Sequence, residues 1–406
     1  MTGVSRARLL DVTRLTSRAG LKPTGVDRVE FAYLDGFVRD SSAEPFGLCR
    51  TALGFVLMDR AGLIALRDAI EAGPFLPPDI LSRWNARLSP AARRGQSFAR
   101  RHAAARARPR ALGQLLGRLP RGFVYFNVGH SNLTGRVFRA MNEAGASDIA
   151  VLIHDTIPLD WPDMQRPGTV PRFRKMLTVA TRHATVLICS TRAVAADIGR
   201  HTGTTPNAPR RVIAPLGIAP LTPTPEALAP GAIPLRPFFV VLGTIEPRKN
   251  HALLLDIWED WGPGAPELLI LGRRGWRNEE VFARLDAGIP HVVEHADLSD
   301  GAIAALLERA QGLLFPSFAE GYGLPPAEAA GLGVPVVCAD LAACREVMQD
   351  WPVYADPTDR YAWETQIRRL SRAPDPHRRS PMTLPDWDAH LRTVLASIGQ
   401  DEPVQQ

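Results

Sequence analysis

The order of predicted strands and helices in the segment FPSFAEGYGLPPAEAAGLGVPVV, residues 315–337, indicates the fold class. An apolar run ending at Phe315 is typical of a buried strand, and the loop SFAEGYGL with its two glycines follows it. Pro325 and Pro326 suit the first turn of a helix, where a missing backbone N–H costs nothing. The run VPVV then predicts a second buried strand. A strand, a loop, a helix and another strand in so short a stretch indicate a parallel α/β sheet.

The loop in this segment has the chemistry of a ligand site. The backbone N–H groups of Tyr322, Gly323 and Leu324 are expected to point out of a helix N-terminus, which binds anions and sugar hydroxyls. Glu320 and Glu328 flank the loop, and carboxylates beside an anion site are expected where they accept hydrogen bonds from hydroxyl groups. A nucleotide sugar offers both a diphosphate and hydroxyls. The alternative is that Glu320 caps a turn in an open loop and Glu328 lies on an ordinary helix.

A second candidate segment is VVLGTIEPRKNH, residues 240–251. A predicted strand ends in a glycine, and Arg248 and Lys249 follow just before a helix that Asn250 could cap. Arg248 can hold a phosphate with two hydrogen bonds, whereas Lys249 acts as a point charge. Both lie at the carboxyl end of a strand, where open α/β sheets bind ligands. The alternative is a solvated charged turn.

The rest of the chain repeats the alternation of strands and helices. Further buried strands are predicted at 238–243, 267–272, 291–296, 312–317 and 334–339, with helices at 251–261, 302–310 and 326–332. In the first half, strands are predicted at 8–15, 123–129, 149–155 and 184–190. The fold class is therefore α/β, with two Rossmann-like, doubly wound parallel-sheet domains that face a cleft.

A break in composition separates the two halves. Residues 219–237 contain six prolines and no regular period, which favours an extended linker. We expect an N-terminal domain at 1–218, a C-terminal domain at 238–375, and a closing helix and tail at 376–406. Residues 1–218 hold 32 Lys and Arg against 16 Asp and Glu, whereas the remainder holds 16 against 26. Such a split in charge suggests different partners for the two halves.

The two candidate segments together resemble glycosyltransferase family 4, the retaining nucleotide-sugar transferases of GT-B fold. The match is most specific at EGYGLPPAEAAGLGVPVV, and it extends through VLIHDTIPLDWP at 151–162 and LILGRRGW at 269–276. The segment LKPTGVDRVEFAY at 21–33 looks like members from bacterial capsule, exopolysaccharide and lipopolysaccharide pathways. Residues 40–120 match no family pattern. The resemblance implies transfer of a hexosyl unit, with mannose-type donors favoured, to a glycan or lipid-linked oligosaccharide acceptor.

The resemblance also implies roles for single residues. Glu320 would hold the donor sugar, and Glu328 would hold the ribose. Arg248 and Lys249 would neutralise the diphosphate, and His154 would lie over the sugar. The other expected substrate contacts come from a flexible turn before a helix near residue 26, from the end of the strand at 149–155, and from the two glycine loops: Thr24, Gly25, Asp155, Gly243, Thr244, Gly321, Tyr322, Gly323 and Leu324. Many family members have an arginine where this chain has Thr244, which leaves the exact phosphate contacts open.

Other function classes fit the sequence less well. The segment GTIEPRKN lacks the lysine pattern of a P-loop, and no G-x-S-x-G motif is present. No cofactor or metal is expected, because positive side chains and helix ends can stabilise the diphosphate, and we interpret Asp386 and Asp388 as helix capping. A GT-B epimerase or phosphorylase and a catalytically silent nucleotide-sugar-binding module remain alternatives. Nucleic acid is disfavoured because the basic region lacks interleaved aromatic residues.

The sequence also bears on location. No apolar run reaches 18 residues, no leader pattern opens the chain, and the four cysteines form no C-x-x-C pair, so we expect buried thiols in the cytoplasm. Residues 83–121 form a basic insertion with eleven arginines and no acidic residue. This insertion is either solvated and disordered or a docking surface for the anionic inner face of the membrane. Leu81, Trp84, Leu88 and Phe98 would then add apolar contacts.

Overall fold

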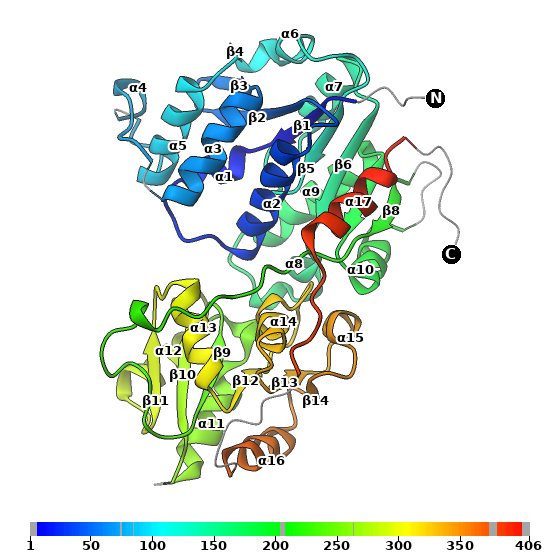
Figure 1. The fold of residues 1–406 in the computed structure, drawn as a ribbon. Helices are drawn as coiled ribbons and strands as arrows, with labels where there is room; N and C mark the ends of the chain where they lie inside the picture. Colours follow the sequence, from blue (N-terminus) through cyan, green and yellow to red (C-terminus); the bar gives the residue numbers. More distant parts are fainter. Residues whose placement is uncertain are drawn as a thin grey trace.

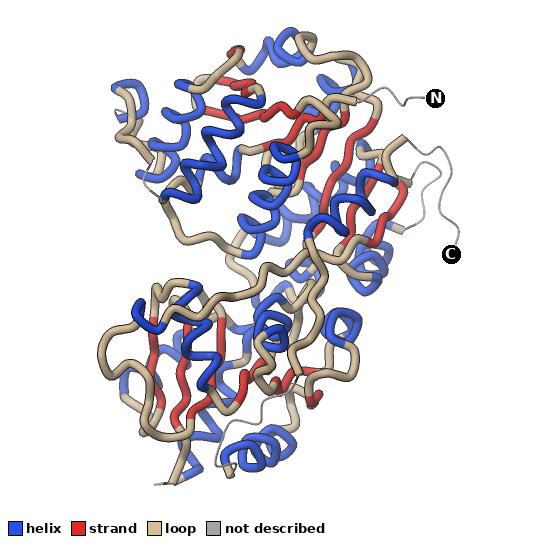
Figure 2. The backbone as a smooth tube through the Cα atoms, viewed as in Figure 1, coloured by secondary structure: helices blue, strands red, loops and turns tan. Residues whose placement is uncertain are grey.

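The computed structural model of the protein describes residues 6–73, 75–83, 85–203, 208–262, 264–372 and 380–399. Two β-sheets lie one above the other in Figure 1, each covered by helices on both faces. The tube in Figure 2 shows that loops and chain crossings occupy the zone between them. The expected α/β class with two doubly wound sheets is confirmed.

The first sheet has the strand order β4-β3-β2-β1-β5-β6-β7-β8. Its strands are β1 (Arg8–Asp11), β2 (Pro45–Thr51), β3 (Gly54–Met58), β4 (Ala105–Ala107), β5 (Val124–Asn127), β6 (Asp148–Ile153), β7 (Val186–Cys189) and β8 (Arg210–Ile213). Strands β2-β1-β5-β6-β7-β8 are parallel, whereas β3 and β4 extend the edge in antiparallel fashion. The sequence predicted β1, β5, β6 and β7 and missed the others.

The second sheet is parallel throughout, in the order β11-β10-β9-β12-β13-β14. Its strands are β9 (Phe238–Leu242), β10 (Glu267–Leu271), β11 (Val292–His295), β12 (Gly312–Phe315), β13 (Val336–Ala339) and β14 (Val353–Ala355). The chain reverses its direction of travel across the sheet between β9 and β12. Open parallel sheets bind ligands outside the carboxyl ends of the strands at such a switch point.

Helices connect the strands and cover both sheets. In the first half they are α1 (Thr13–Ser17), α2 (Gly25–Arg39), α3 (Arg60–Ala72), α4 (Ile80–Arg83), α5 (Pro90–Arg101), η1 (Pro109–Ala111), α6 (Leu112–Leu116), α7 (Gly135–Glu143), α8 (Ile157–Asp160), η2 (Pro162–Met164), α9 (Thr169–His183) and α10 (Arg192–Thr202). In the second half they are η3 (Pro225–Ala227), η4 (Pro247–Lys249), α11 (His251–Trp261), α12 (Glu279–Ala287), α13 (Asp300–Arg309), α14 (Leu324–Gly331), α15 (Ala342–Met348), α16 (Arg360–Ser371) and α17 (Trp387–Ala396).

The last helix returns to the first sheet. Figure 1 shows α17 beside α2 and β8, far from the second sheet that precedes it in the chain. His390 of α17 makes a 2.8 Å hydrogen bond with the hydroxyl of Tyr33 on α2. The Asp386 side chain accepts from the Ala389 N–H and caps α17, as predicted. The chain therefore crosses between the two sheets twice.

The start of α11 differs from the prediction, whereas the state of the cysteines agrees with it. Asn250 precedes α11 but makes no capping hydrogen bond, because it adopts a left-handed conformation and its amide donates to the Pro357 carbonyl. The four cysteines are buried free thiols, as expected. Within the described residues, no helix combines the length and the apolar character needed to cross a bilayer.

The basic segment is folded where the structure describes it. Residues 85–121 form α5, β4, η1 and α6, and α5 packs against α1. The alternative of a solvated, disordered insertion is wrong for the described residues, because part of the segment is folded into the interior. Phe98 is 7% exposed and belongs to the core, and Arg100 is 6% exposed and pairs with Asp79 at 2.6 Å. Trp84 lies outside the described residues.

Candidate functional site

A pocket of about 710 Å³ lies between the two sheets, at the carboxyl ends of their strands. Every residue that the sequence singled out for the site lines it. These residues are Thr24, Gly25, His154, Asp155, Gly243, Thr244, Arg248, Lys249, Glu320, Gly321, Tyr322, Gly323, Leu324 and Glu328. The structure thus brings them together, although their individual roles stay predictions.

Glu320, Arg248 and Lys249 form the charged centre of the pocket. Glu320 Oε1 lies 2.6 Å from Lys249 Nζ and 2.7 Å from an Arg248 guanidinium nitrogen. Burial alone would raise the pKa of Glu320, but the two cations outweigh it and lower this pKa to about 2. The expectation that Glu320 lies in an open loop is wrong, because its side chain is only 9% exposed. The alternative of a solvated charged turn at Lys249 is excluded by its 8% side-chain exposure.

The backbone of two loops places these charges. Gly243, at the end of β9, has φ 142°, and a Cβ on Gly272 would lie 1.9 Å from the Gly243 carbonyl oxygen. Both positions therefore require glycine. The turn η4 is tied to the loop after β12, because Phe318 N–H donates to the Arg248 carbonyl at 2.8 Å. The basic pair and Glu320 are thus held on two loops that meet at the switch point.

The loop at 320–324 also touches the first domain. A Cβ on Gly321 would lie 2.4 Å from the His154 carbonyl oxygen, so the two backbones meet closely. The Tyr322 hydroxyl donates to the Leu216 carbonyl at 2.7 Å. Gly323 has φ 90° and turns the chain into α14. The loop that carries Glu320 is therefore positioned by both halves of the molecule.

His154 and Asp155 follow β6 and face this loop. His154 Nε2 donates to the Val128 carbonyl at 2.7 Å, and burial lowers the pKa of His154 to about 3. The imidazole is therefore neutral at pH 7, with Nδ1 as its acceptor. Burial also raises the pKa of Asp155 to about 6, against the attraction of Arg248. A neutral imidazole can orient a hydroxyl group, as a hydrogen-bond acceptor, without adding charge.

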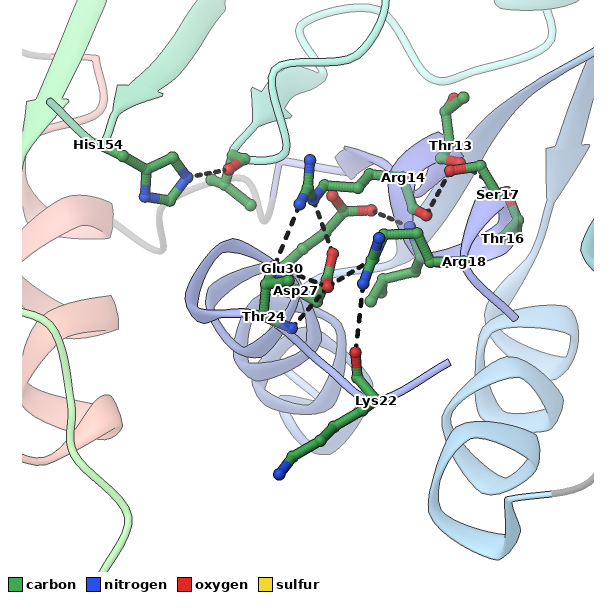
Figure 3. A network of polar contacts seen from close by, with 12 residues as sticks. Thr13, Arg14, Thr16, Ser17, Arg18, Lys22, Thr24, Asp27, Glu30 and His154 are labelled. Carbon is green, nitrogen blue, oxygen red and sulfur yellow. Dashed lines mark hydrogen bonds and ion pairs between the residues drawn. The ribbon is translucent and has the colours of Figure 1, made fainter. Parts of the chain in front are cut away.

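Thr24 and Gly25 lie at the start of α2 and line the pocket from the first domain. Figure 3 shows Thr24 beside Asp27 at this helix start. Thr24 and Asp27 form a capping box, and Asp27 is also held by Arg14 and Arg18 at 2.7 Å each. The expected flexible turn is therefore a firmly tied helix start. The expected start near residue 26 is correct to within one residue.

Two site residues were missed by sequence reasoning. Glu246 is buried and pairs with Arg248 at 2.6 Å, so Arg248 is shared between two carboxylates. Arg28, on α2, pairs with Glu328 at 2.6 Å across the pocket. Glu246 could have been found from the sequence, because it lies only two residues before Arg248. Arg28 carries no such signal, because its partner is 300 residues away.

The position where many members of the resembled family have an arginine is Thr244 in this chain. Thr244 itself lines the pocket, and the nearby Arg273 and Arg274 pair with acidic side chains. Among the residues that the structure describes, no group of three or more His, Cys, Asp or Glu side chains is arranged to hold a metal ion. The expectation of a metal-free site stays a prediction.

The part of the chain that matches a known family contains the second sheet. Residues 236–372 match the model of the family "Glycosyl transferases group 1". The matched residues include both glycine loops, Arg248, Lys249, Glu320 and Glu328.

The curated relatives include mannosyltransferases of Escherichia coli. The chain is 32% identical over 237 residues to the serotype-specific mannosyltransferase WbdA of Escherichia coli. This alignment covers 53% of this chain and 28% of WbdA. The chain is 33% identical over 128 residues to the O-antigen chain mannosyltransferase B of Escherichia coli, which covers 30% of this chain and 33% of that protein. The chain thus spans about a third or less of the length of these two relatives.

Solved structures share the whole fold at low sequence identity. Anabaena Alr3699/HepE, in complex with UDP-glucose, aligns over 90% of both chains with a TM-score of 0.59 and 14% identity. The apo form of the lipopolysaccharide outer core galactosyltransferase WaaB aligns over 90% of both chains with a TM-score of 0.52 and 15% identity.

The fold and the pocket between the two sheets define the class, a two-domain protein of GT-B architecture. Within that class, residues 236–372 match the family "Glycosyl transferases group 1", and the chain is similar in sequence to bacterial mannosyltransferases.

Proposed function

We propose that this chain is a retaining glycosyltransferase of cell-surface polysaccharide synthesis. It moves a hexosyl unit, in our proposal a mannosyl unit, from a nucleoside-diphosphate sugar to a hydroxyl of a glycan or lipid-linked acceptor. The mannosyltransferase relatives, one of them named for the O-antigen chain, support the mannosyl assignment. The UDP-glucose complex of a protein with the same fold supports a nucleotide-sugar donor.

One observation carries the proposal. The partly buried Arg248 and the buried Lys249 lie beside Glu320 at the switch point of the second sheet, next to the N-terminus of α14. Two cations and the positive end of a helix are preorganised donors for the charge that develops on a leaving diphosphate. Glu320 keeps them in place before the donor arrives, and its carboxylate accepts hydrogen bonds from the sugar hydroxyls.

The same cluster favours a same-face route to retention. A double displacement needs a nucleophilic carboxylate close to the anomeric carbon. Glu320 is held between two cations with a pKa of about 2, which makes it a weak nucleophile. In the proposed step the bond from the anomeric carbon to the diphosphate oxygen breaks and the bond to the acceptor oxygen forms on the same face. The acceptor proton moves to the leaving phosphate oxygen, and the two domains exclude water.

We place the protein in the cytoplasm, on the inner face of the membrane where a lipid-linked acceptor would lie. The proposed docking surface is the α4 region of the first domain. Leu76, Ile80 and Leu81 are 64%, 73% and 65% exposed, and Arg83 and Arg87 are exposed next to them in the chain. Basic side chains near an anionic surface contribute about 1 kcal/mol each, and apolar side chains add shallow insertion. Phe98 and Arg100, both buried, have no part in it.

Ligand affinity in a single variant tests the donor site. Lys249→Ala should weaken binding of UDP or GDP, whichever the wild type binds, by about 1.5–3 kcal/mol, because a charged hydrogen bond to the diphosphate is lost. Uridine or guanosine should bind as before. The exposed Lys175→Ala variant is the control and should change neither affinity. Equal losses for nucleotide and nucleoside would mean that Lys249 only supports the fold.

Co-sedimentation with liposomes tests the membrane surface. Binding should require anionic lipid, weaken as salt rises, and fall when Ile80 and Leu81 become Ser and when Arg83 and Arg87 become Ser. The double variant of Arg172 and Arg174, exposed on α9, is the matched control for lost charge and should bind normally. Indifference to lipid charge would refute the docking surface and leave the transferase assignment standing.

A further inference from the structure

Arg28 joins the first domain to two carboxylates of the second. One terminal nitrogen of its guanidinium lies 2.6 Å from Glu328 Oε1, and the other lies 2.7 Å from Asp300 Oδ2. Arg28 comes from α2, Glu328 from α14 and Asp300 from the start of α13. Two hydrogen bonds from one planar group, one to each carboxylate, fix the direction of the guanidinium. The ion pair therefore spans the pocket rather than lying on one wall.

Arg28 lies in a part of α2 that is held in place by several side-chain contacts. The capping box of Thr24 and Asp27 fixes the first turn of α2, and Arg14 and Arg18 hold Asp27 from α1 and the loop after it (Figure 3). Lys22 adds a contact to the second domain, because its ammonium donates to the Leu298 carbonyl. The position of the Arg28 guanidinium is thus set by the helix start and not by a mobile loop.

Glu328 depends on this partner. Its side chain is 8% exposed, and among the described residues Arg28 is the side chain that bonds its carboxylate. Burial raises the pKa of Glu328, and the charge of Arg28 is the largest opposing effect. Only Oε1 is engaged by Arg28, which leaves Oε2 as an acceptor in the pocket. A carboxylate that must accept hydrogen bonds from hydroxyls has to be both ionised and correctly turned.

We propose that Arg28 is the positioning residue of the ribose site: it holds Glu328 from the opposite domain so that Glu328 Oε2 can accept the ribose hydroxyls. This inference rests on the proposed function, in which Glu328 binds the ribose of the donor. It makes the ribose site a property of both domains together. The donor is then held fully only when α2 and α14 face each other as they do here.

Other contacts between the domains supply matched controls. Glu346 on α15 accepts hydrogen bonds from the Arg192 and Ala193 N–H groups at the start of α10, away from the donor carboxylates. Arg39, on the same helix as Arg28, pairs with Asp35 and Asp388 and does not reach Glu328. Glu346→Gln removes an interdomain charge, and Arg39→Met removes an α2 arginine, while both leave the proposed ribose site intact.

The experiment measures affinity by calorimetry for UDP and GDP, for their 2′,3′-dideoxy counterparts and for pyrophosphate. Arg28→Met should weaken binding of the ribonucleotide that the wild type prefers by about tenfold, as expected for a charge-assisted hydrogen bond. The dideoxy nucleotide and pyrophosphate should bind as to the wild type. The preference for ribose over dideoxyribose therefore falls in Arg28→Met and persists in Arg39→Met and Glu346→Gln.

A double-mutant cycle separates positioning from direct contact. The variant Arg28→Met with Glu328→Gln should lose no more affinity than Glu328→Gln alone, because Arg28 acts through Glu328. Additive losses, an unchanged ribose preference in Arg28→Met, or an equal loss for pyrophosphate would each overturn the inference. A wild type that binds neither UDP, GDP nor pyrophosphate would instead refute the proposed function, and the inference would fail with it.

Discussion

Glu320 meets two cations inside the pocket, and this arrangement links stability to the proposed chemistry. The carboxylate keeps Arg248 and Lys249 in place in the absence of a ligand, with contacts of 2.7 and 2.6 Å. Breaking a buried ion pair is costly because it leaves an uncompensated charge in a poorly hydrated site. A substitution at Glu320 is therefore expected to affect both folding and turnover.

Glu320→Gln should lower turnover by roughly two orders of magnitude, about 2.7 kcal/mol, because an oriented charged acceptor for the sugar is lost. The free energy of unfolding should fall by about 2 kcal/mol, since Arg248 and Lys249 lose their counter-charge. Because the pKa of Glu320 is lowered in the fold, its stabilisation is present above pH 4.5 and is lost as pH falls towards 2. Urea unfolding and initial rates measure the two effects.

The surface variant Glu364→Gln, which breaks the pair with Arg368 along α16, serves as the control and should leave both quantities almost unchanged. Near-normal turnover in Glu320→Gln would remove Glu320 from the donor site.

For Asp155 we expect the opposite dependence of folding stability on pH. Its pKa is raised to about 6 in the fold, so the folded state binds the proton more tightly than the unfolded state, and stability falls as pH rises from about 4 to 6. Asp155→Asn removes this loss and keeps an oxygen to accept the Ile157 N–H. The variant should be more stable than wild type by about 2 kcal/mol at pH 8, with little difference at pH 4. Denaturant titration at both pH values, with the exposed Asp163→Asn as control, decides the point, and a pH-independent difference would contradict it.

At the scale of elements, the sequence predicted what local patterns encode. Buried parallel strands are continuous apolar runs, so β9, β10, β12 and β13 could be recognised. Strands β2, β3 and β4 were missed, although β2 and β3 form a hairpin of neighbouring residues; β4 pairs with β3 from a distant part of the chain. The glycine loops revealed most of the site, whereas Arg28 could not be found because the contact with Glu328 exists only in three dimensions.

The packing of α5 on α1 gives a prediction at this scale. Gly95 of α5 lies so close to α1 that a Cβ would be 1.6 Å from the Thr16 carbonyl oxygen. Gly95→Ala should destabilise the protein by about 3 kcal/mol, because overpacking outweighs the gain of about 1 kcal/mol in helix propensity. Gly113→Ala in α6, where a Cβ would meet no atom within 4 Å, should be neutral or slightly stabilising. Similar thermal unfolding of both variants would contradict the close approach of α1 and α5.

At the scale of the whole molecule, the two sheets form one site. The pocket takes Thr24, His154 and Asp155 from the first half and Arg248, Lys249 and Glu320 from the second. The chain crosses between the halves once before β9 and once before α17, which packs against α2. We expect the reaction to need both halves. The second half provides the expected donor contacts, and the first half provides the opposite wall of the pocket.

The central claim is that this pocket transfers a sugar with retention. The most direct measurement is an NMR analysis of the products formed from an α-linked nucleotide hexose, GDP-mannose first, and a mannoside acceptor. We predict a new glycosidic bond whose anomeric configuration equals that of the donor, formed by wild type and lost in Glu320→Gln. A product of inverted configuration, an epimerised donor without transfer, or the same products from Glu320→Gln as from wild type would contradict the account.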